Sequence, residues 1–200
     1  GKNWGLGRSD LKELAAGALL HDIGKMCVAG PILKKEGLLT KQEYEQMCFH
    51  PKYGFELLRS APGVSLLSAH VAYQHHERED GSGYPRGLAE DQIHLYAKIV
   101  MAADSYDAMT SGRRYSRTLW SHEALAQLAA DVPEKYGPEI ITLLAQSVAL
   151  YPIGSVVLLN NLEVGLVTDV NRADIKIEFL TGEAKGQIVA LAPNALLKIV

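Results

Sequence analysis

The chain has 200 residues, of which 48% are hydrophobic and 22% charged, so it is long enough for one core and a small second unit. This composition excludes the disordered and fibrous classes, and a formal net charge of −3 lacks the basic footprint of a protein that binds polymeric nucleic acid. No apolar stretch reaches the roughly 18 to 20 residues that a membrane span needs, and no basic leader opens the chain.

Cys27 and Cys48 stand alone without CxxC spacing, which favours reduced core cysteines. Together these features predict a cytoplasmic protein without a membrane span.

Apolar residues recur at helical spacing through the first three quarters of the chain. Thr40 and Glu43 are placed as a capping box, Pro51 should restart the helix that follows, and Pro138 suits the first turn of the last helix. The expected helices cover about residues 10–21, 40–50, 51–60, 64–76, 92–109, 121–130 and 138–150.

After Tyr151 and Pro152 the apolar period changes from helical to alternating. Short strands are expected near residues 156–158, 164–170, 175–179, 188–190 and 197–199, with turns between them. The sequence therefore predicts a mainly α fold: a helical domain over residues 1–151, followed by a small antiparallel β unit over residues 152–200.

Of seven histidines, four lie beside a turn or element end and next to another candidate ligand. With the candidate carboxylates they form a mixed nitrogen and carboxylate set: His21, Asp22, His50, His75, His76 and Asp104. Nitrogen and carboxylate ligands of this kind suit iron, manganese, zinc or nickel, and the set lacks the thiolates of a structural zinc site. Adjacent side chains on a helix project about 100° apart, so we expect His75 and His76 to serve more than one ion. The other histidines, His70, His94 and His122, are interpreted as ordinary polar residues.

Four motifs follow one another along the chain: His-Asp-Ile-Gly-Lys at 21–25, His-Pro-Lys-Tyr-Gly at 50–54, His-His-Glu at 75–77 with Gly-Tyr-Pro at 83–85, and Asp104 through Ser111 followed by Arg113. Their order and spacing closely resemble the HD-GYP domain, a branch of the HD metal-dependent phosphohydrolases. The resemblance covers about residues 10–130.

The resemblance implies hydrolysis of cyclic di-GMP to linear pGpG, and in some members to GMP. It implies two or three divalent ions, iron or manganese before zinc or nickel, held by His21, Asp22, His50, His75, His76 and Asp104. Asp22 would bridge two ions and be catalytic. Two ions about 3.5 to 4 Å apart can activate water for in-line attack on phosphorus.

Substrate contacts are expected from Lys25, Tyr84, Asp107 and Arg113. Lys25 lies one helical turn beyond His21, so its ammonium group is expected beside the scissile phosphate as a catalytic group. The alternatives are a surface lysine at 25, a loop-ordering role for Tyr84, a helix-surface carboxylate at 107 and a solvated arginine at 113.

The chain departs from the family pattern upstream, where the family has a further histidine about thirty residues before the His-Asp pair. Only twenty residues precede His21 and none is a histidine, so we expect a domain whose first helices are missing; a degenerate domain is the alternative. Expected partners are an upstream sensory or receiver domain and GGDEF-domain proteins. The alternative functions are a non-catalytic module that binds a cyclic dinucleotide or a partner protein, and an HD hydrolase of another phosphorylated nucleotide.

Overall fold

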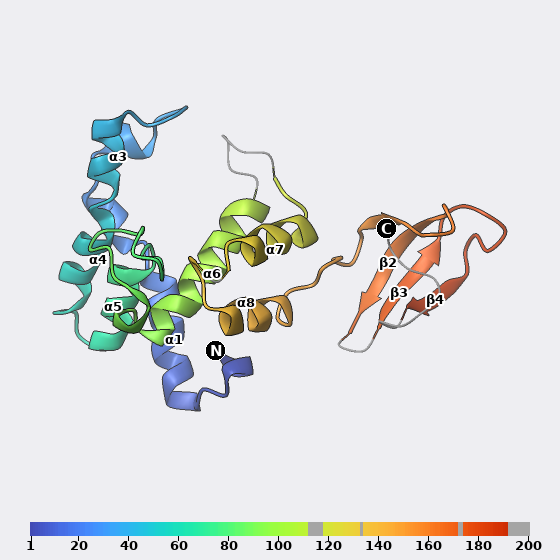
Figure 1. Cartoon of the computed structure of the whole chain (residues 1–200), viewed down its shortest axis with the longest axis horizontal. Coiled ribbons are helices and arrows are strands. Elements are labelled where there is room, and N and C mark those ends of the chain that lie inside the picture. Colours follow the sequence, from blue (N-terminus) through green and yellow to red (C-terminus); the bar gives the residue numbers. More distant parts are fainter. Residues whose placement is uncertain (112–117, 133, 172–173, 192–200) are drawn as a thin grey trace. The chain divides into compact units, whose positions relative to one another are not determined.

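The computed structural model describes residues 1–111, 118–132, 134–171 and 174–191. The chain divides into two compact units, Gly1–Ser147 and Val148–Val200. The first is helical and the second is an antiparallel sheet, which confirms the predicted fold class (Figure 1).

Helices make up the first unit. They are α1 (Arg8–Leu20), α2 (Gly30–Leu33), α3 (Lys41–Met47), α4 (His50–Leu58), α5 (Leu66–Gln74), α6 (Leu95–Thr110), α7 (Ser121–Ala130) and α8 (Pro138–Ala145), with short 3₁₀ helices η1 (Lys2–Trp4), η2 (Ile23–Cys27) and η3 (Glu90–Gln92).

Side chains near the helix ends explain where several helices begin. The capping box of α3 is confirmed, because Thr40 Oγ1 accepts from the Glu43 amide at 3.3 Å and Glu43 Oε2 accepts from the Thr40 amide at 2.7 Å. Pro51 lies in the first turn of α4, as predicted. Helix α6 begins three residues later than expected, because His94 Nδ1 accepts from the Tyr96 amide and so caps the helix.

Helix α8 begins at Pro138 as expected but ends at Ala145 rather than near residue 150. The Ser147 hydroxyl donates to the Leu143 carbonyl at 2.6 Å, while the Ser147 amide bonds to the Leu144 carbonyl. At the Leu143 carbonyl the serine hydroxyl thus takes the place that the Ser147 amide would have if the α-helix continued.

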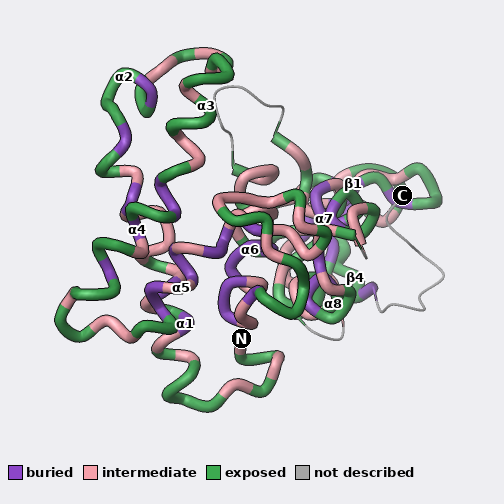
Figure 2. The backbone as a smooth tube through the Cα atoms, turned by 60° about the vertical axis from the view of Figure 1, so that its left-hand side comes forward, coloured by how far each residue is buried: buried purple, intermediate pink, exposed green. Residues whose placement is uncertain are grey.

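The buried residues of the first unit gather on α5 and α6 (Figure 2). Gly17 of α1 lets that helix approach α5 closely, since an added Cβ would lie 2.7 Å from Val71 Cγ2. Helix α6 in turn packs Met101 against Leu128 of α7 and Ile140 of α8. Packing on several sides therefore holds α5 and α6 in place, together with the side chains at the end of α5 and along α6.

The second unit is a four-stranded antiparallel sheet in the order β1-β2-β3-β4. Its strands are β1 (Val156–Leu158), β2 (Val164–Val170), β3 (Ile175–Phe179) and β4 (Ile188–Leu191). Val157, Val167 and Ile177 form the centre of its core. The expected strand at 197–199 lies outside the described residues.

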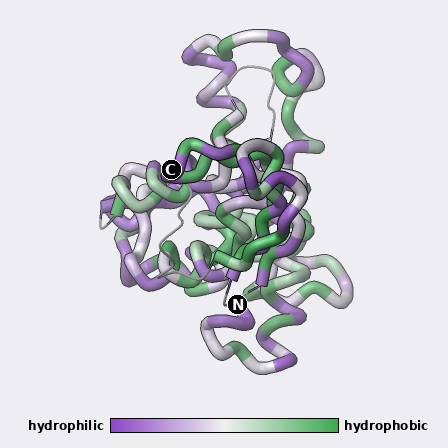
Figure 3. The backbone as a smooth tube through the Cα atoms, turned by 90° about the vertical axis from the view of Figure 1, so that its right-hand side faces the viewer, coloured by the Kyte–Doolittle hydropathy of each residue, from purple (hydrophilic) through white to green (hydrophobic). Residues whose placement is uncertain are grey.

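The cysteines differ from the expectation of core residues, because Cys27 is exposed and Cys48 is half-buried; both are free. Hydrophilic and hydrophobic segments alternate along the backbone (Figure 3). Among the described residues, no helix has both the length and the apolar character to cross a membrane.

Candidate metal centre

The six predicted metal ligands come from four segments of the first unit. His21 directly follows α1 and Asp22 precedes η2, His50 opens α4, and His75 and His76 follow α5. Asp104 lies within α6. Three helix ends and the middle of α6 therefore bring together residues from 21 to 104 of the chain.

The Asp22 carboxylate lies at the centre of the group. Its Oδ1 is 3.3 Å from His50 Nε2 and 3.6 Å from His75 Nε2, and its Oδ2 is 3.4 Å from His21 Nε2. One ligand atom from each of Asp22, His50, His75 and His76 lies within 4.8 Å of the others. Asp104 Oδ1 lies on the His21 side, 3.8 Å from His21 Nε2.

Three of the histidines are oriented in the same way by the backbone. Each Nδ1 faces a carbonyl three residues earlier in the chain, and since a carbonyl can only accept, each Nδ1 donates. The pairs are His21 with Ala18 at 2.7 Å, His50 with Met47 at 2.7 Å, and His75 with Ala72 at 2.9 Å. Such outer bonds set the tautomer of a metal-binding histidine and leave its Nε2 lone pair free for the ion.

The pKa values favour neutral imidazoles at His75 and His76 and a charged carboxylate at Asp22. Burial lowers the pKa of His75, and burial is also the largest cause that lowers the pKa of His76, to about 2. Burial would lower the pKa of His21 as well, but its hydrogen bonds to Asp104 and the Ala18 carbonyl, with the nearby carboxylate charges, raise it. Burial would raise the pKa of Asp22, but the Lys25 ammonium, which donates to Oδ2, holds it below its usual range. Neutral imidazole and ionised carboxylate are the forms that bind a metal ion.

This arrangement leaves a place for a cation. Asp22 Oδ1 is buried and accepts no hydrogen bond. A neutral His75 that uses its proton at Nδ1 presents a lone pair at Nε2, which also lies 3.3 Å from His50 Nε2. Lone pairs and a carboxylate at such distances repel one another unless a cation lies between them, so the donor set fits a divalent ion.

His75 and His76 lie closer together than a continuous helix would place them. Helix α5 ends at Gln74, and the two rings have centroids 4.0 Å apart. The ligand atoms of both belong to the same group of four. That the two histidines serve more than one ion stays a prediction.

Two predicted substrate residues border the group. Lys25 donates to Asp22 Oδ2 at 2.5 Å. The Tyr84 ring stacks on the His76 ring, with centroids 4.7 Å apart, and burial raises the pKa of Tyr84 so that it stays a neutral phenol. Tyr44 of α3 lies edge-on to Tyr84, and no pattern in the sequence had pointed to it.

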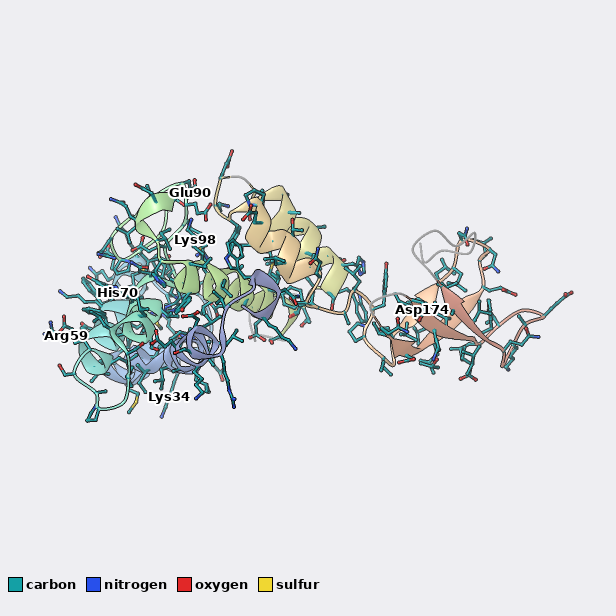
Figure 4. All side chains as sticks on the ribbon, turned by 90° about the horizontal axis from the view of Figure 1, so that it is seen from below. Lys34, Arg59, His70, Glu90, Lys98 and Asp174 are labelled. Atoms are coloured by element: carbon teal, nitrogen blue, oxygen red, sulfur yellow. The ribbon has the colours of Figure 1, made fainter. Side chains whose placement is uncertain are left out.

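The two remaining predicted substrate residues are Asp107 and Arg113. Asp107 is exposed, three residues beyond Asp104 on α6, and accepts from the Ser111 hydroxyl at 2.9 Å. Arg113 lies outside the described residues. His70, labelled in Figure 4, has its ring 5.0 Å from that of Phe55. It takes no part in the group of four ligand atoms.

A helical domain in which helix ends bring histidine and aspartate ligands around one carboxylate has the architecture of a metal-dependent hydrolase. A family model described as an HD domain matches residues 1–140. The chain belongs to the HD domain family, which is a family of metal-dependent hydrolases, and the predicted resemblance is confirmed.

Known proteins similar to this chain agree with that family. A cyclic di-GMP phosphodiesterase of Pseudomonas aeruginosa is 39% identical over 159 residues, which are 80% of this chain and 38% of that protein. A 3'3'-cGAMP-specific phosphodiesterase of Vibrio cholerae is 36% identical over 139 residues, 70% of this chain and 30% of that protein. The chain thus spans well under half the length of either relative.

A solved structure shares the fold. An HDG"Y"P protein of Bdellovibrio bacteriovorus matches with a TM-score of 0.58 and 22% identity, over 72% of this chain and 45% of that one. The likeness supports the helical architecture described above.

Proposed function

We propose that the chain is the hydrolase domain of a bacterial phosphodiesterase that cleaves cyclic di-GMP to linear pGpG, and further to GMP. The observation that carries this proposal is the convergence of the His21, His50 and His75 Nε2 atoms on the Asp22 carboxylate. The name of the Pseudomonas relative supports cyclic di-GMP as the substrate, and the name of the Vibrio relative supports 3'3'-cGAMP as the second candidate.

The geometry supports specific roles for the six ligand residues. Asp22 Oδ1 faces His50 and His75, while Asp22 Oδ2 faces His21, beyond which lies Asp104. We infer that Asp22 would hold divalent ions together with His50, His75 and His76 on one side and with His21 and Asp104 on the other. Iron or manganese is expected, and a third ion would need ligands from a segment upstream. Divalent ions bound here supply Lewis-acid chemistry, lowering the pKa of water and offsetting charge on phosphate oxygens.

The chain's own residues then bind and orient the substrate. The Lys25 ammonium, held by Asp22, is placed to offset negative charge on the phosphate. Tyr84 offers a neutral hydroxyl group and a ring face beside His76. Asp107 and Arg113 remain proposed contacts to the base and phosphate of the substrate, from α6 and from the segment that follows it.

The proposed function is tested with purified protein, ferrous or manganous ion and cyclic di-GMP, with products followed by chromatography. We expect linear pGpG to appear only with metal, and we expect a chelator to stop turnover until metal is added back. Equal rates for several cyclic dinucleotides would overturn the substrate assignment. Nucleotide binding without turnover under every metal would favour the non-catalytic module.

A substitution of Lys25 by methionine separates the catalytic role from a surface role. Methionine keeps the length of the side chain but removes the ammonium group, so we expect kcat to fall by about 10² to 10³-fold. Lys52 is an exposed lysine of α4, and Lys52→Met is the matched control. Steady-state rates on cyclic di-GMP give the comparison, and equal rates for the two variants would assign Lys25 to the surface.

The domain is expected to act within a longer protein. The relatives are more than twice as long as the part that matches this chain. We therefore keep the expectation of an upstream sensory or receiver domain, and of GGDEF-domain proteins as partners.

A further inference from the structure

We infer that Glu77 is a positioning residue, whose carboxylate holds the loop of residues 78–88 so that Tyr84 lies against His76. This inference rests on the proposed function, because it concerns a residue that we place beside the substrate. No metal-ligand pattern in the sequence had pointed to Glu77, which directly follows the two site histidines.

Glu77 is completely buried, and both its oxygens bond to the backbone of the same loop. Oε1 accepts from the Arg86 amide at 3.0 Å, and Oε2 accepts from the Leu88 amide at 2.9 Å. The two amides lie 9 and 11 residues further along the chain. Burying a carboxylate costs free energy unless it is well bonded, and bonds from backbone amides to a charged acceptor are among the strong ones. One side chain thus ties the end of the loop to its beginning.

The part of the loop between these bonds returns to the backbone that carries His76. The Tyr84 amide donates to the His76 carbonyl at 3.0 Å. Gly83 packs so closely that an added Cβ would lie 2.4 Å from the Cα of Glu77 and the amide nitrogen of Arg78. The Tyr84 ring then stacks on the His76 ring with an angle of 24° between the planes. The position of Tyr84 is therefore set by backbone contacts that hold only while the loop stays closed.

The bonding pattern requires a carboxylate at position 77. Two amide donors need two acceptor oxygens, and glutamine would offer one oxygen and one NH₂ group, which leaves one buried amide facing a donor. Aspartate would be shorter by one methylene and would not reach both amides. Glu77→Gln is consequently the smallest change that opens one end of the loop.

Glu79 provides a matched control in the same loop. Its side chain is also buried, at 5% exposure, but its partner is the ammonium group of Lys98 on α6, 2.9 Å away (Figure 4 labels Lys98). Glu79→Gln removes a buried charge without touching the acceptors of the Arg86 and Leu88 amides. It therefore measures the effect of losing a buried ion pair alone.

The test is a double-mutant cycle on the manganese-loaded full chain, with Glu77→Gln, Tyr84→Ala and both together. Outer residues of metal sites typically change activity by about 10 to 100-fold, and we expect Glu77→Gln to lower kcat/KM for cyclic di-GMP by such a factor with metal content unchanged. In the Tyr84→Ala background the same change should cost less than about threefold, because the two effects share one cause. A role confined to fold stability predicts the full cost in both backgrounds and would overturn the inference.

Hydrogen exchange gives a readout that does not depend on activity. The amides of Tyr84 and of residues 86–88 should exchange faster in Glu77→Gln and at the parent rate in Glu79→Gln. If Glu77→Gln fails to fold, Gly83→Ala displaces Tyr84 by a different contact, and its loss of activity should likewise vanish in the Tyr84→Ala background. Unchanged exchange in Glu77→Gln, or additive effects for Gly83→Ala, would refute the positioning role. A parent protein that turns over no cyclic dinucleotide would instead refute the proposed function, and the exchange measurement would still decide the role of Glu77.

Discussion

Asp22→Ala is expected to abolish both cyclic di-GMP hydrolysis and metal binding. Asp22 is the one side chain of the group that faces His21, His50 and His75 together. Without its negative charge, the Oδ1 side of the group keeps only the neutral imidazole nitrogens of His50, His75 and His76, and the remaining carboxylate, Asp104, lies on the His21 side. Loss of an outer partner costs about 10 to 100-fold in such sites, so loss of the central ligand should lower kcat/KM by more than about 10³-fold.

Metal content and thermal unfolding report the loss of metal binding in Asp22→Ala without any measurement of turnover. In the parent protein, added manganese should raise Tm, because an ion that binds only the folded state stabilises it. Asp22→Ala should show no such rise, whereas Asp91→Ala, which changes an exposed aspartate of η3, should behave like the parent. Asp22→Asn keeps the shape and one oxygen but not the charge, and it should resemble Asp22→Ala. Turnover that survives in Asp22→Ala would contradict the ligand assignment as a whole.

Much of the fold follows from local patterns in the sequence. Alternating apolar residues predict β2 and β3. Val167 on β2 and Ile177 on β3 are indeed buried. Local signals also predict the starts of α3 and α8 at Thr40 and Pro138. The predicted end of α8 was wrong, because it was placed later than the helix ends in the structure. The bond from the Ser147 hydroxyl to the Leu143 carbonyl has no distinct sequence pattern. Helix ends depend on which of several local hydrogen bonds wins, and these differ by little free energy.

The candidate site, too, could be predicted from the sequence only in part. The motifs predict the six metal-ligand candidates, and the structure brings all six into one region. The bonds that orient them are invisible in the sequence, since a backbone carbonyl such as that of Met47 carries no residue signature. The bonds of Glu77 join positions 9 and 11 residues apart across an irregular loop, so no helical or strand period reveals them. Contacts of this kind follow only from the folded arrangement.

Gly24→Ala is expected to disrupt the metal centre through packing alone. Gly24 lies in η2, two residues after Asp22, and an added Cβ would lie 2.0 Å from the His50 carbonyl oxygen and 2.4 Å from the Gly54 amide nitrogen. Both atoms belong to the backbone of α4, so no side chain can rotate away to make room. Helix α4 must move away from η2, and His50 at its first residue moves with it, away from Asp22.

The effect of Gly24→Ala should be large because the displaced residue, His50, belongs to the metal centre. Overpacking of this kind costs about 1 to 3 kcal/mol of folding stability, and a shift of 1 Å at a catalytic group can cost about 10²-fold in rate. Gly30→Ala is the matched control, because an added Cβ at Gly30 has nothing within 4 Å. Gly24→Ala should have a lower Tm, a lower metal content and a lower kcat/KM than Gly30→Ala. If Gly24→Ala behaved like Gly30→Ala, then the close approach of η2 to α4 would not be what holds His50 beside Asp22.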